Sequence, residues 1–275
     1  MCIEPIAEKY GCSRKPIIRT LKENNIEIRL IGDKEYSILR RKYDINDNYF
    51  ALDKQTSNSA YILGLIASDG CIEQYDNSVY IELQRIDREI LEKVNLELKN
   101  QRPVQDYINY SKNTENSKIY FYSKQIREDL ANYNLMPDKT HKIDLDFTYN
   151  IKPEYLIDYI RGHFDGDGSI KWTNGCIQWQ IDSTSLNTLK SIQNCLLKQY
   201  GIKTTIKVHK EPRRKMNLYR IYFYGYENAL KLYKLFYETG SNLYLKRKQE
   251  KYLQLLLKYK THETSHLLNK DEKIC

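Results

Sequence analysis

The chain lacks the features by which several common protein classes are recognised. Its six cysteines are scattered, with no C-x-x-C pair and no paired histidines, which excludes the usual zinc-binding modules and a disulfide framework. No stretch approaches the length of a membrane span, and the first residues are too polar for a signal peptide. We therefore expect a soluble, reduced and intracellular protein that has no membrane partner.

Charge of one sign does not dominate the composition either. Lys and Arg outnumber Asp and Glu by 44 to 36, which gives a net charge of +8 and suits an anionic partner. A ribosomal protein or a basic tail would be more lopsided, so we expect the basic residues to gather on particular surfaces. A chain of 275 residues has room for two or three small domains with an ample apolar core.

One stretch of the chain occurs in two copies. Residues 62–70 read ILGLIASDG and residues 160–168 read IRGHFDGDG, and Gly64 and Gly162 are 98 residues apart (162 − 64). In each copy small residues recur four apart, which on a helix places them on one face and lets a second helix approach closely. We therefore expect two apolar helices packed together, with Asp69 and Asp167 meeting at their carboxyl ends.

Two carboxylates in that place require a counter-charge. The carboxyl end of a helix carries partial negative charge, which disfavours an acidic side chain there. A divalent cation reverses this, because carboxylates and free carbonyls are the hard oxygen ligands that Mg²⁺ prefers. A single Asp-Gly pair more often marks a helix stop and a turn. Two copies in matching contexts favour a cation site at Asp69 and Asp167.

These residues resemble the LAGLIDADG homing endonucleases, in the form that carries two motifs on one chain. The second copy matches at its glycines and at both acidic positions, whereas the first has Ala67 at the sixth position and keeps Asp69 at the eighth. The resemblance covers roughly residues 56–260. It implies an α+β fold of two pseudo-symmetric αββαββα halves with antiparallel saddle sheets. It also implies a site-specific endonuclease that cuts both strands of double-stranded DNA across the minor groove.

The resemblance further implies roles for particular residues. Asp69 and Asp167 are the expected catalytic, metal-binding acids, with Mg²⁺ as the cofactor and Mn²⁺ as a substitute. The backbone carbonyls of Ser68 and Gly166 are further expected ligands. A basic residue is expected near each phosphate: Lys139 in the first half, and Lys248, in preference to Lys246, in the second.

Three other sets of polar residues are expected to have different roles. Residues two apart diverge on a helix, so we expect Asp165 to cap or bridge structurally and not to bind the catalytic metal. His163 is expected to pack or to hydrogen-bond at the interface of the helices. Gln84 and its repeat partner Asp182, or the nearby Gln180, are expected to orient a metal-bound water.

The remaining sequence repeats in the same order. The first half, residues 56–150, predicts a strand at 78–84, a helix at 87–99, strands at 104–110 and 118–123, and a helix at 124–133. The second half, residues 151–275, predicts a motif helix beginning at Pro153, a strand at 176–181, a helix at 186–200, strands at 204–209 and 219–224, and a helix at 228–237. The run IYFY at 119–122 recurs at 221–224, an offset of 102 (221 − 119). Two copies with so long a period predict a pseudo-dimer of α+β class.

Outward side chains of the two sheets are expected to position phosphates and to read base edges. In the first half these are Tyr80, Glu82, Gln84, Asn109, Lys112, Asn113 and Lys118. In the second half they are Gln178, Gln180, Lys203, Lys207, Arg213, Arg214, Lys215 and Arg220. Hairpin tips are often charged for solubility alone, and for residues 213–215 that alternative stays open.

Residues 1–30 predict a further small module of two short helices. Gly11 permits the left-handed turn between them, Ser13 is a good N-cap, and Pro16 then falls in the first turn of the second helix. The segment is similar to a helix-turn-helix, whose expected DNA contacts are Arg14, Lys15 and Arg19. A plain helical hairpin is the alternative. Residues 31–55 follow as a linker whose basic triplet at 40–42 either tracks phosphates or is simply solvated.

Two other functions use the same scaffold. An intron RNA-splicing maturase would bind its host intron RNA, and a transcriptional regulator would bind DNA without cutting it. Retention of both Asp69 and Asp167 favours cleavage, because a binder gains nothing from two opposed carboxylates. The ends of the chain lack the residues of an intein. We therefore expect a free-standing or intron-encoded monomer, in the cytoplasm or in the DNA-containing compartment of an organelle.

Overall fold

The computed structural model describes residues 9–11, 13–24, 42–73, 77–111, 113–137, 150–209 and 217–271, without the side chains of Arg14, Lys22, His209 and residues 263–271. The chain divides into two units, residues 1–42 and residues 43–275. Within the described residues, no helix combines the length and the apolar character that crossing a membrane requires.

The first unit contains the helix α2 (Arg14–Glu23). It follows Gly11, whose φ of +58° is the left-handed conformation that the sequence predicts for this turn. Lys15 and Arg19 are exposed on α2, where Arg19 pairs with Glu23 at 2.8 Å. Most of the first expected helix lies outside the described residues, so the helix-turn-helix stays a prediction.

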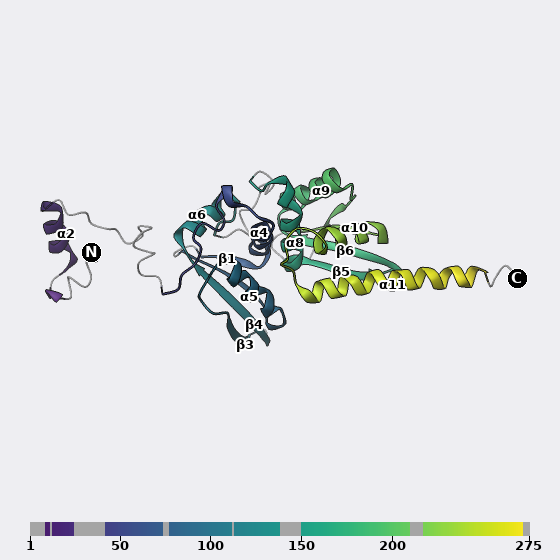
Figure 1. Ribbon diagram of the computed structural model, residues 1–275, viewed down its shortest axis with the longest axis horizontal. Helices are drawn as coiled ribbons and strands as arrows, with labels where there is room; N and C mark the ends of the chain where they lie inside the picture. Colours follow the sequence, from purple (N-terminus) through teal and green to yellow (C-terminus); the bar gives the residue numbers. More distant parts are fainter. Residues whose placement is uncertain are drawn as a thin grey trace. The chain divides into compact units, whose positions relative to one another are not determined.

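The second unit consists of two halves whose strands and longer helices follow in the same order as far as residues 132 and 237 (Figure 1). The first half contains η1 (Leu52–Lys54), α4 (Ser57–Asp69), β1 (Gly70–Ile72), β2 (Ser78–Gln84), η2 (Arg85–Asp87), α5 (Arg88–Glu97), β3 (Gln105–Asn109), β4 (Thr114–Tyr122) and α6 (Lys124–Asn132). The second half contains η4 (Pro153–Tyr155), α8 (Leu156–Asp167), β5 (Gly168–Thr173), β6 (Cys176–Ser183), α9 (Leu186–Tyr200), β7 (Thr205–His209), β8 (Leu218–Tyr224), α10 (Tyr226–Tyr237) and α11 (Lys246–Asp271).

Each half forms one antiparallel sheet. The strand orders are β1-β2-β4-β3 and β5-β6-β8-β7, so the two sheets have the same topology. Figure 1 shows α4 and α8 side by side between the sheets, with one sheet on each side of this helix pair. The expected α+β fold of two pseudo-symmetric halves is confirmed.

Several element boundaries differ from the expected ones. The first motif helix has Thr56 as its N-cap, in a capping box with Ser59, although Ser57, Asn58 and Ser59 were the N-cap candidates that the sequence predicts. Pro153 opens the short helix η4, and the second motif helix begins only at Leu156. The long helix α11 was not expected. Its Lys258 ammonium lies 4.8 Å from the centre of the Trp172 ring of β5, so the helix packs along the second sheet.

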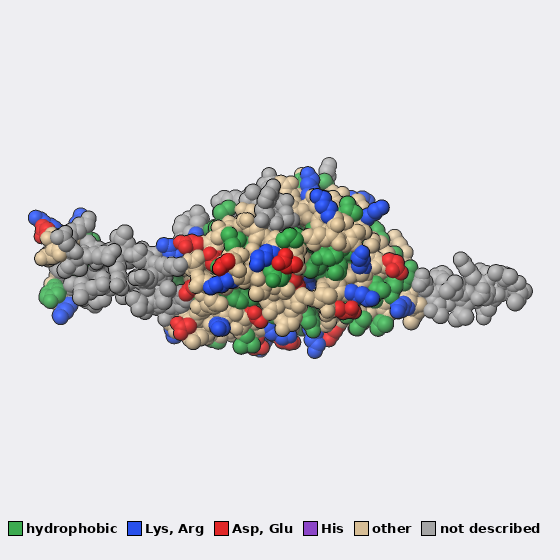
Figure 2. Space-filling view, turned by 45° about the horizontal axis from the view of Figure 1, so that its top comes forward, with side chains coloured by type: hydrophobic (Ala, Val, Ile, Leu, Met, Phe, Trp, Pro, Cys, Tyr) green, Lys and Arg blue, Asp and Glu red, His purple; other side chains and the backbone are tan. Residues whose placement is uncertain are grey.

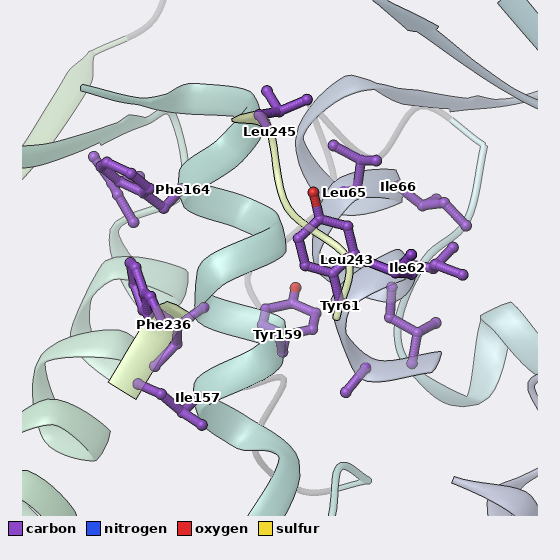
Figure 3. Close-up of a cluster of buried hydrophobic side chains, with 14 of the residues drawn as sticks. Tyr61, Ile62, Leu65, Ile66, Ile157, Tyr159, Phe164, Phe236, Leu243 and Leu245 are labelled. Atoms are coloured by element: carbon purple, nitrogen blue, oxygen red, sulfur yellow. The ribbon is translucent and has the colours of Figure 1, made fainter. Parts of the chain in front are cut away.

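The core follows the helix pair into both sheets. Along β2, Val79, Ile81 and Leu83 are buried and alternate with side chains that point to the opposite face. On the other side of the pair, Phe164 of α8 stacks on Trp179 of β6 with ring centres 5.5 Å apart. Figure 3 shows Phe164 on the side of α8 away from α4, and Ile62 and Ile66 on the far side of α4. The two motif helices are therefore buried on almost every face.

The end of the expected linker belongs to this second unit. Residues 31–41 lie outside the described residues, but Phe50 is buried with 1% exposure. The Asn46 amide donates to the Leu98 carbonyl at 2.8 Å, which holds this segment beside the first half.

The registers of the two sheets reveal how the repeat period grows along the chain. Gly70 pairs with Ile81 and Gly168 with Ile181, so the offset is 98 in the motif helices and 100 (181 − 81) in the second strands. It reaches the expected 102 in β4 and β8, where Ile119 and Ile221 are equivalent (221 − 119). Asp182 is therefore equivalent to Glu82, and the expected pairing of Gln84 with Asp182 is wrong by two residues.

Candidate functional site

The seam between the two halves is a close approach of α4 and α8. A Cβ atom on Gly64 would lie 2.1 Å from the carbonyl oxygen of Tyr159, and one on Gly162 would lie 2.0 Å from that of Tyr61. Both distances are far below any real contact, and in each case the obstacle is backbone that cannot rotate away. The two glycines therefore permit the helix contact that the small-residue pattern predicts.

Both helices end at the predicted acids. Gly70 and Gly168 follow with φ angles of −80° and −88°, so the chain passes directly into β1 and β5 without a left-handed turn. A Cβ atom on Gly70 would lie 2.6 Å from the Ile66 carbonyl oxygen, so this glycine is needed for space and not for its φ angle. The simple interpretation of Asp-Gly as a turn does not describe these positions.

The carboxyl ends of α4 and α8 lie against each other. A Cβ atom on Gly166, the residue before Asp167, would lie 2.6 Å from Oδ2 of Asp69 and 2.0 Å from Oγ of Ser68. The Asp167 side chain is 44% exposed and Asp69 is half-buried. The structure therefore brings the two predicted acids into one region that remains open to solvent.

Lys248 occupies the same region. Its side chain is buried, and Nζ donates to the carbonyl oxygens of Phe164 at 2.7 Å, Gly168 at 2.7 Å and Gly166 at 3.3 Å. Burial lowers the pKa of Lys248 to about 8, although the charges of Asp165, Asp69 and Asp167 act in the opposite direction. The ammonium group thus caps the end of α8, where helix carbonyls carry partial negative charge.

Asp165 has the bridging position expected of it. Its Oδ2 accepts hydrogen bonds from the Tyr61 hydroxyl of α4 and from the Leu245 amide, both at 2.8 Å. Burial raises the pKa of Asp165, and nearby Lys248 opposes that shift. His163 is likewise buried and stacks on Tyr159, with Nε2 4.0 Å from Oδ2 of Asp167.

The donor set at the helix ends suits a hard divalent cation. Asp69 and Asp167 supply carboxylate oxygens, and the carbonyls of Ser68 and Gly166 are the expected additional ligands. Among the described residues, no group of three or more His, Cys, Asp or Glu side chains gathers in one place. A cation here would depend on main-chain oxygens and on the ligands that a bound partner brings.

The outward faces of the two sheets carry matching ion pairs. Glu82 and Lys118 are register partners with Oε2 and Nζ 3.7 Å apart, and Asp182 and Arg220 are joined by two hydrogen bonds of 2.6 and 2.8 Å. Lys118 and Arg220 are equivalent, since their numbers differ by 102 (220 − 118). Both cations lie on the face opposite the core. The Lys118 ammonium also lies 3.3 Å from the centre of the Tyr80 ring, a cation–π contact.

Other expected DNA contacts are distributed unevenly. Lys207 is exposed on β7, and Gln84 is exposed at the end of β2, three positions beyond the residue opposite Gly70 and therefore about 10 Å along the strand. Gln178 and Gln180 are almost fully covered, and their amides bond to each other at 3.1 Å. Both glutamines alternate with the core residues Ile177, Trp179 and Ile181, so they lie on the outward face as expected, but neighbouring side chains cover them.

Some expected residues fall outside the described parts of the chain. These are Lys112, Lys139, Arg213, Arg214 and Lys215, together with the side chain of Arg14. On the face of the molecule drawn in Figure 2, basic and acidic side chains are interspersed and do not form a uniform basic patch.

Sequence reasoning missed the groups that hold the start of α11. Arg247 Nε lies 2.8 Å from both carboxylate oxygens of Asp87, which joins α11 to the first half. The segment before α11 is bonded to Asp158 and Arg161 of α8. These two polar residues recur at helical spacing with Asp165 in an otherwise apolar helix, a signal that could have identified them.

Comparison with known proteins agrees with this architecture. The family model described as LAGLIDADG-like domain matches residues 57–134 and 154–236, one segment in each half. The uncharacterized protein MJ0314 of Methanocaldococcus jannaschii is 26% identical over 206 residues, an alignment that covers 72% of this chain and 72% of the relative.

Solved structures of low sequence identity are also similar. The homing endonuclease I-WcaI bound to its DNA recognition sequence is 14% identical with a TM-score of 0.48, covering 73% of this chain and 90% of that one. The N-terminal LAGLIDADG domain of DUF199/WhiA is 12% identical with a TM-score of 0.41, covering 76% and 93%. I-DmoI in complex with DNA and Mn is 20% identical with a TM-score of 0.41, covering 60% and 89%.

The family model matches one segment in each half, and each segment contains a motif helix that meets the other across the glycine seam. The chain belongs to the family of LAGLIDADG-like domains.

Proposed function

We propose that this protein is a site-specific endonuclease that uses a divalent cation to cut both strands of double-stranded DNA. The observation that carries this proposal is the meeting of Asp69 and Asp167 at the adjoining carboxyl ends of α4 and α8, close to solvent. Acids at two helix carboxyl ends are unfavourable in the absence of a cation. Because both halves belong to one chain, a monomer supplies both acids.

The roles of the side chains follow from their positions. Asp69 and Asp167, with the carbonyls of Ser68 and Gly166, would hold Mg²⁺ or Mn²⁺. When bound, the cation supplies an activated water and neutralises charge that develops on the phosphate. Lys248 fixes the end of α8 and contributes positive charge beside Asp167. Its counterpart in the first half would be Lys139.

Outward residues of the sheets would place the DNA on these acids. Lys118 and Arg220 are basic, lie at equivalent positions of the two sheets and face away from the core. Contacts to phosphates fix the register of a duplex, and contacts to base edges select its sequence. Arg220 is suited to contact with a phosphate, with a guanine edge as the alternative, and Asp182 holds its guanidinium in one orientation beforehand.

One observation favours a second candidate, a DNA-binding regulator that does not cut. The Lys248 ammonium already donates to the Gly166 carbonyl, one of the expected cation ligands, and partly neutralises the end of α8. Because the Lys248 ammonium already compensates the negative charge at the end of α8, a metal ion stabilises this end less. In this alternative the sheets bind DNA in the same way. Asp69 and Asp167 then bind no catalytic metal and are only part of the contact between α4 and α8. A maturase would instead bind its host intron RNA.

A selection from random duplex sites tests the proposal. The purified protein is incubated with a duplex library and Mg²⁺, new ends are sequenced, and bound but uncut duplexes are recovered in parallel. We expect paired cuts at one defined site, abolished in Asp69→Asn and Asp167→Asn while binding to that site persists. Asp53→Asn, on the exposed helix η1, is the control and should cut normally.

Three outcomes separate the candidates. Paired cuts that depend on both acids support the endonuclease. Tight binding to a defined duplex without any cut supports the regulator. Binding to structured intron RNA, with no preference among duplexes, supports the maturase.

A further inference from the structure

A stripe of buried polar residues runs along α8. Asp158, Arg161 and Asp165 are three and four positions apart, so they lie on neighbouring turns of one face, and their exposed fractions are 2%, 0% and 1%. Charged residues are rarely buried to this extent unless they have specific partners. These three side chains should therefore have specific hydrogen-bonding or charged partners inside the fold.

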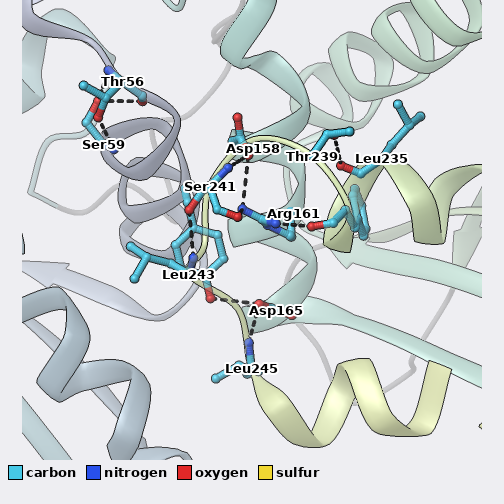
Figure 4. A network of polar contacts seen from close by, with 12 residues as sticks. Thr56, Ser59, Asp158, Arg161, Asp165, Leu235, Thr239, Ser241, Leu243 and Leu245 are labelled. Atoms are coloured by element: carbon cyan, nitrogen blue, oxygen red, sulfur yellow. Dashed lines mark hydrogen bonds and ion pairs between the residues drawn. The ribbon is translucent and has the colours of Figure 1, made fainter. Parts of the chain in front are cut away.

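The partner is the segment between α10 and α11, residues 238–245. Asp158 Oδ1 accepts from the Ser241 amide at 2.8 Å, and Arg161 donates to the Ser241 carbonyl at 2.8 Å and to the Phe236 carbonyl at the end of α10. Asp165 accepts from the Leu245 amide at 2.8 Å. Figure 4 shows this segment crossing α8 with these bonds along its length. The stripe therefore binds main-chain groups at the end of α10, in the middle of the segment and at its last residue.

Close packing reinforces these bonds at Gly240. Its φ of +72° is in the left-handed region, and a Cβ atom there would lie 2.4 Å from Oδ1 of Asp158. The segment can approach the stripe this closely only because this residue is glycine.

The helix α11, which carries Lys248, follows the segment directly. Leu245 is the last residue before α11, and Lys248 is the third residue of that helix. Fixing the Leu245 amide on Asp165 therefore fixes the first turn of α11 relative to the end of α8. The Lys248 ammonium then reaches the carbonyls of Phe164, Gly166 and Gly168.

The first half has no such stripe. With the offset of 98 that relates the motif helices, the residues equivalent to Asp158, Arg161 and Asp165 are Ala60, Leu63 and Ala67 (158 − 98, 161 − 98 and 165 − 98). None of these side chains can form a hydrogen bond or carry charge. Ala60 and Leu63 are instead part of the apolar core.

We propose that Asp158, Arg161 and Asp165 form a positioning device, which holds the segment before α11 so that Lys248 stays at the end of α8, and that the two cutting centres are therefore unequal. The centre at Asp167 is preorganised and cuts its strand first, whereas α4, which ends at Asp69, carries no such stripe. The order of cutting rests on the proposed endonuclease function. The positioning of Lys248 does not.

The positioning is tested without DNA or metal, by reductive methylation of lysines followed by mass spectrometry of peptides. Lys246 and Lys251 are exposed on the same helix and serve as internal controls. We expect Lys248 to react at least about tenfold more slowly than either. Its buried amine is methylated only after its three hydrogen bonds break, and once exposed it has an ordinary pKa and no advantage over the two controls. Equal reactivity of the three lysines overturns the positioning.

Three variants separate positioning from general stability. Asp165→Ala gives α8 the residue that α4 has at the equivalent position, and it should remove most of the protection of Lys248. Asp165→Asn keeps an oxygen that can accept from both Tyr61 and Leu245, so protection should persist. Gly240→Ala displaces the segment from the opposite side and should expose Lys248 without any change in α8. If Lys248 stays protected in both Asp165→Ala and Gly240→Ala, the proposal is wrong.

The unequal centres are tested on the duplex site found by the selection above, with each strand labelled separately. Wild type should accumulate a nick in one strand, formed about tenfold faster than the second cut. Asp165→Ala should slow that first cut only, and Asp165→Asn should restore it. Equal rates in wild type, or equal slowing of both strands in Asp165→Ala, overturn the order of cutting. If neither strand is cut, the proposed function fails and the order fails with it, while protection of Lys248 still supports the positioning.

Discussion

At the scale of single residues, the most unusual side chain is Arg161. It is fully buried, donates to the carbonyls of Phe236 and Ser241, and is paired with Asp158 at 3.1 Å. A buried ion pair contributes little net stability compared with apolar residues that fill the same space, but removal of one partner leaves the other charge without compensation. The stability of this fold should therefore depend strongly on Arg161.

We predict that Arg161→Met lowers the free energy of unfolding by about 3–5 kcal/mol, measured by urea denaturation at neutral pH. The loss arises from the uncompensated Asp158 carboxylate and from two carbonyls without their donor. The double variant Asp158→Asn/Arg161→Met is the control. It removes the isolated charge and keeps an acceptor for the Ser241 amide, so it should be more stable than Arg161→Met. A loss below about 1 kcal/mol in the single variant would contradict this account.

The same pair has a dependence on pH. Burial raises the pKa of Asp158, and the charge of Arg161 opposes that shift, so removal of Arg161 raises the pKa further. A carboxyl whose pKa is higher in the folded state destabilises the fold above its folded pKa, and this penalty is relieved as the pH falls through that value. The stability deficit of Arg161→Met relative to wild type should therefore shrink from about pH 8 to about pH 4.5, a window above the unfolded pKa of about 3.9. A constant deficit over this range would exclude Asp158 as its source.

At the scale of elements, the two sheets present equivalent cations on their outward faces. Lys118 is paired with Glu82 and Arg220 with Asp182, so each basic side chain is held in place by an ion pair. Such pairs keep the basic groups in defined places before a duplex arrives. Equivalent places in two pseudo-symmetric sheets suit the two half-sites of one target.

We predict that Lys118→Ala and Arg220→Ala each weaken DNA binding and reduce the slope of log affinity against log salt by about 1, because each removes one phosphate contact and the counterions it releases. Lys93→Ala is the matched control. Lys93 is also paired with an acid, Glu89, but it lies on α5 and should leave the slope unchanged. Affinity is measured by fluorescence anisotropy across a salt series. If Arg220 reads a base instead, its substitution changes sequence preference with an unchanged slope.

The sequence predicted those helices and strands that are determined by patterns of residues close together in the chain. Small residues four apart in an apolar run required a close helix contact, and Gly64 and Gly162 lie at that contact. Alternation of apolar residues predicted β2, β4, β6 and β8 to within a few residues. The long helix α11 was missed because its first turn, residues 246–249, consists of polar and basic residues without apolar periodicity. Its place depends on distant partners such as Asp87.

The candidate site was predictable only in part. Asp69 and Asp167 end the helices that the motif predicts, so helix geometry alone placed them together. The environment of Lys248 was not predictable, because its partners are backbone carbonyls, which no sequence pattern marks. The expected equivalence of Gln84 and Asp182 is wrong because the β5–β6 hairpin of the second half is two residues longer than the β1–β2 hairpin of the first half. This difference is visible only in the strand register.

At the scale of the whole molecule, the chain combines two units. Residues 43–275 contain the two halves with their shared core, and residues 1–42 contain α2 after a left-handed Gly11. Lys15 and Arg19 are exposed on α2 and are expected to contact DNA. A second module that binds next to the first raises the overall affinity without new contacts at the main site.

We predict that deletion of residues 1–42 weakens binding to the selected site by about a hundredfold, shortens the footprint and leaves the cut positions unchanged. The cut positions persist because Asp69, Asp167 and both sheets belong to residues 43–275. Affinity is measured by gel shift, the footprint by hydroxyl radicals, and folding of the shortened chain by thermal denaturation. Full-length Lys15→Ala/Arg19→Ala is the control, since it should reproduce the loss of affinity while the unit stays attached. An unchanged footprint in the shortened chain would exclude DNA contact by the first unit and would support the plain helical hairpin.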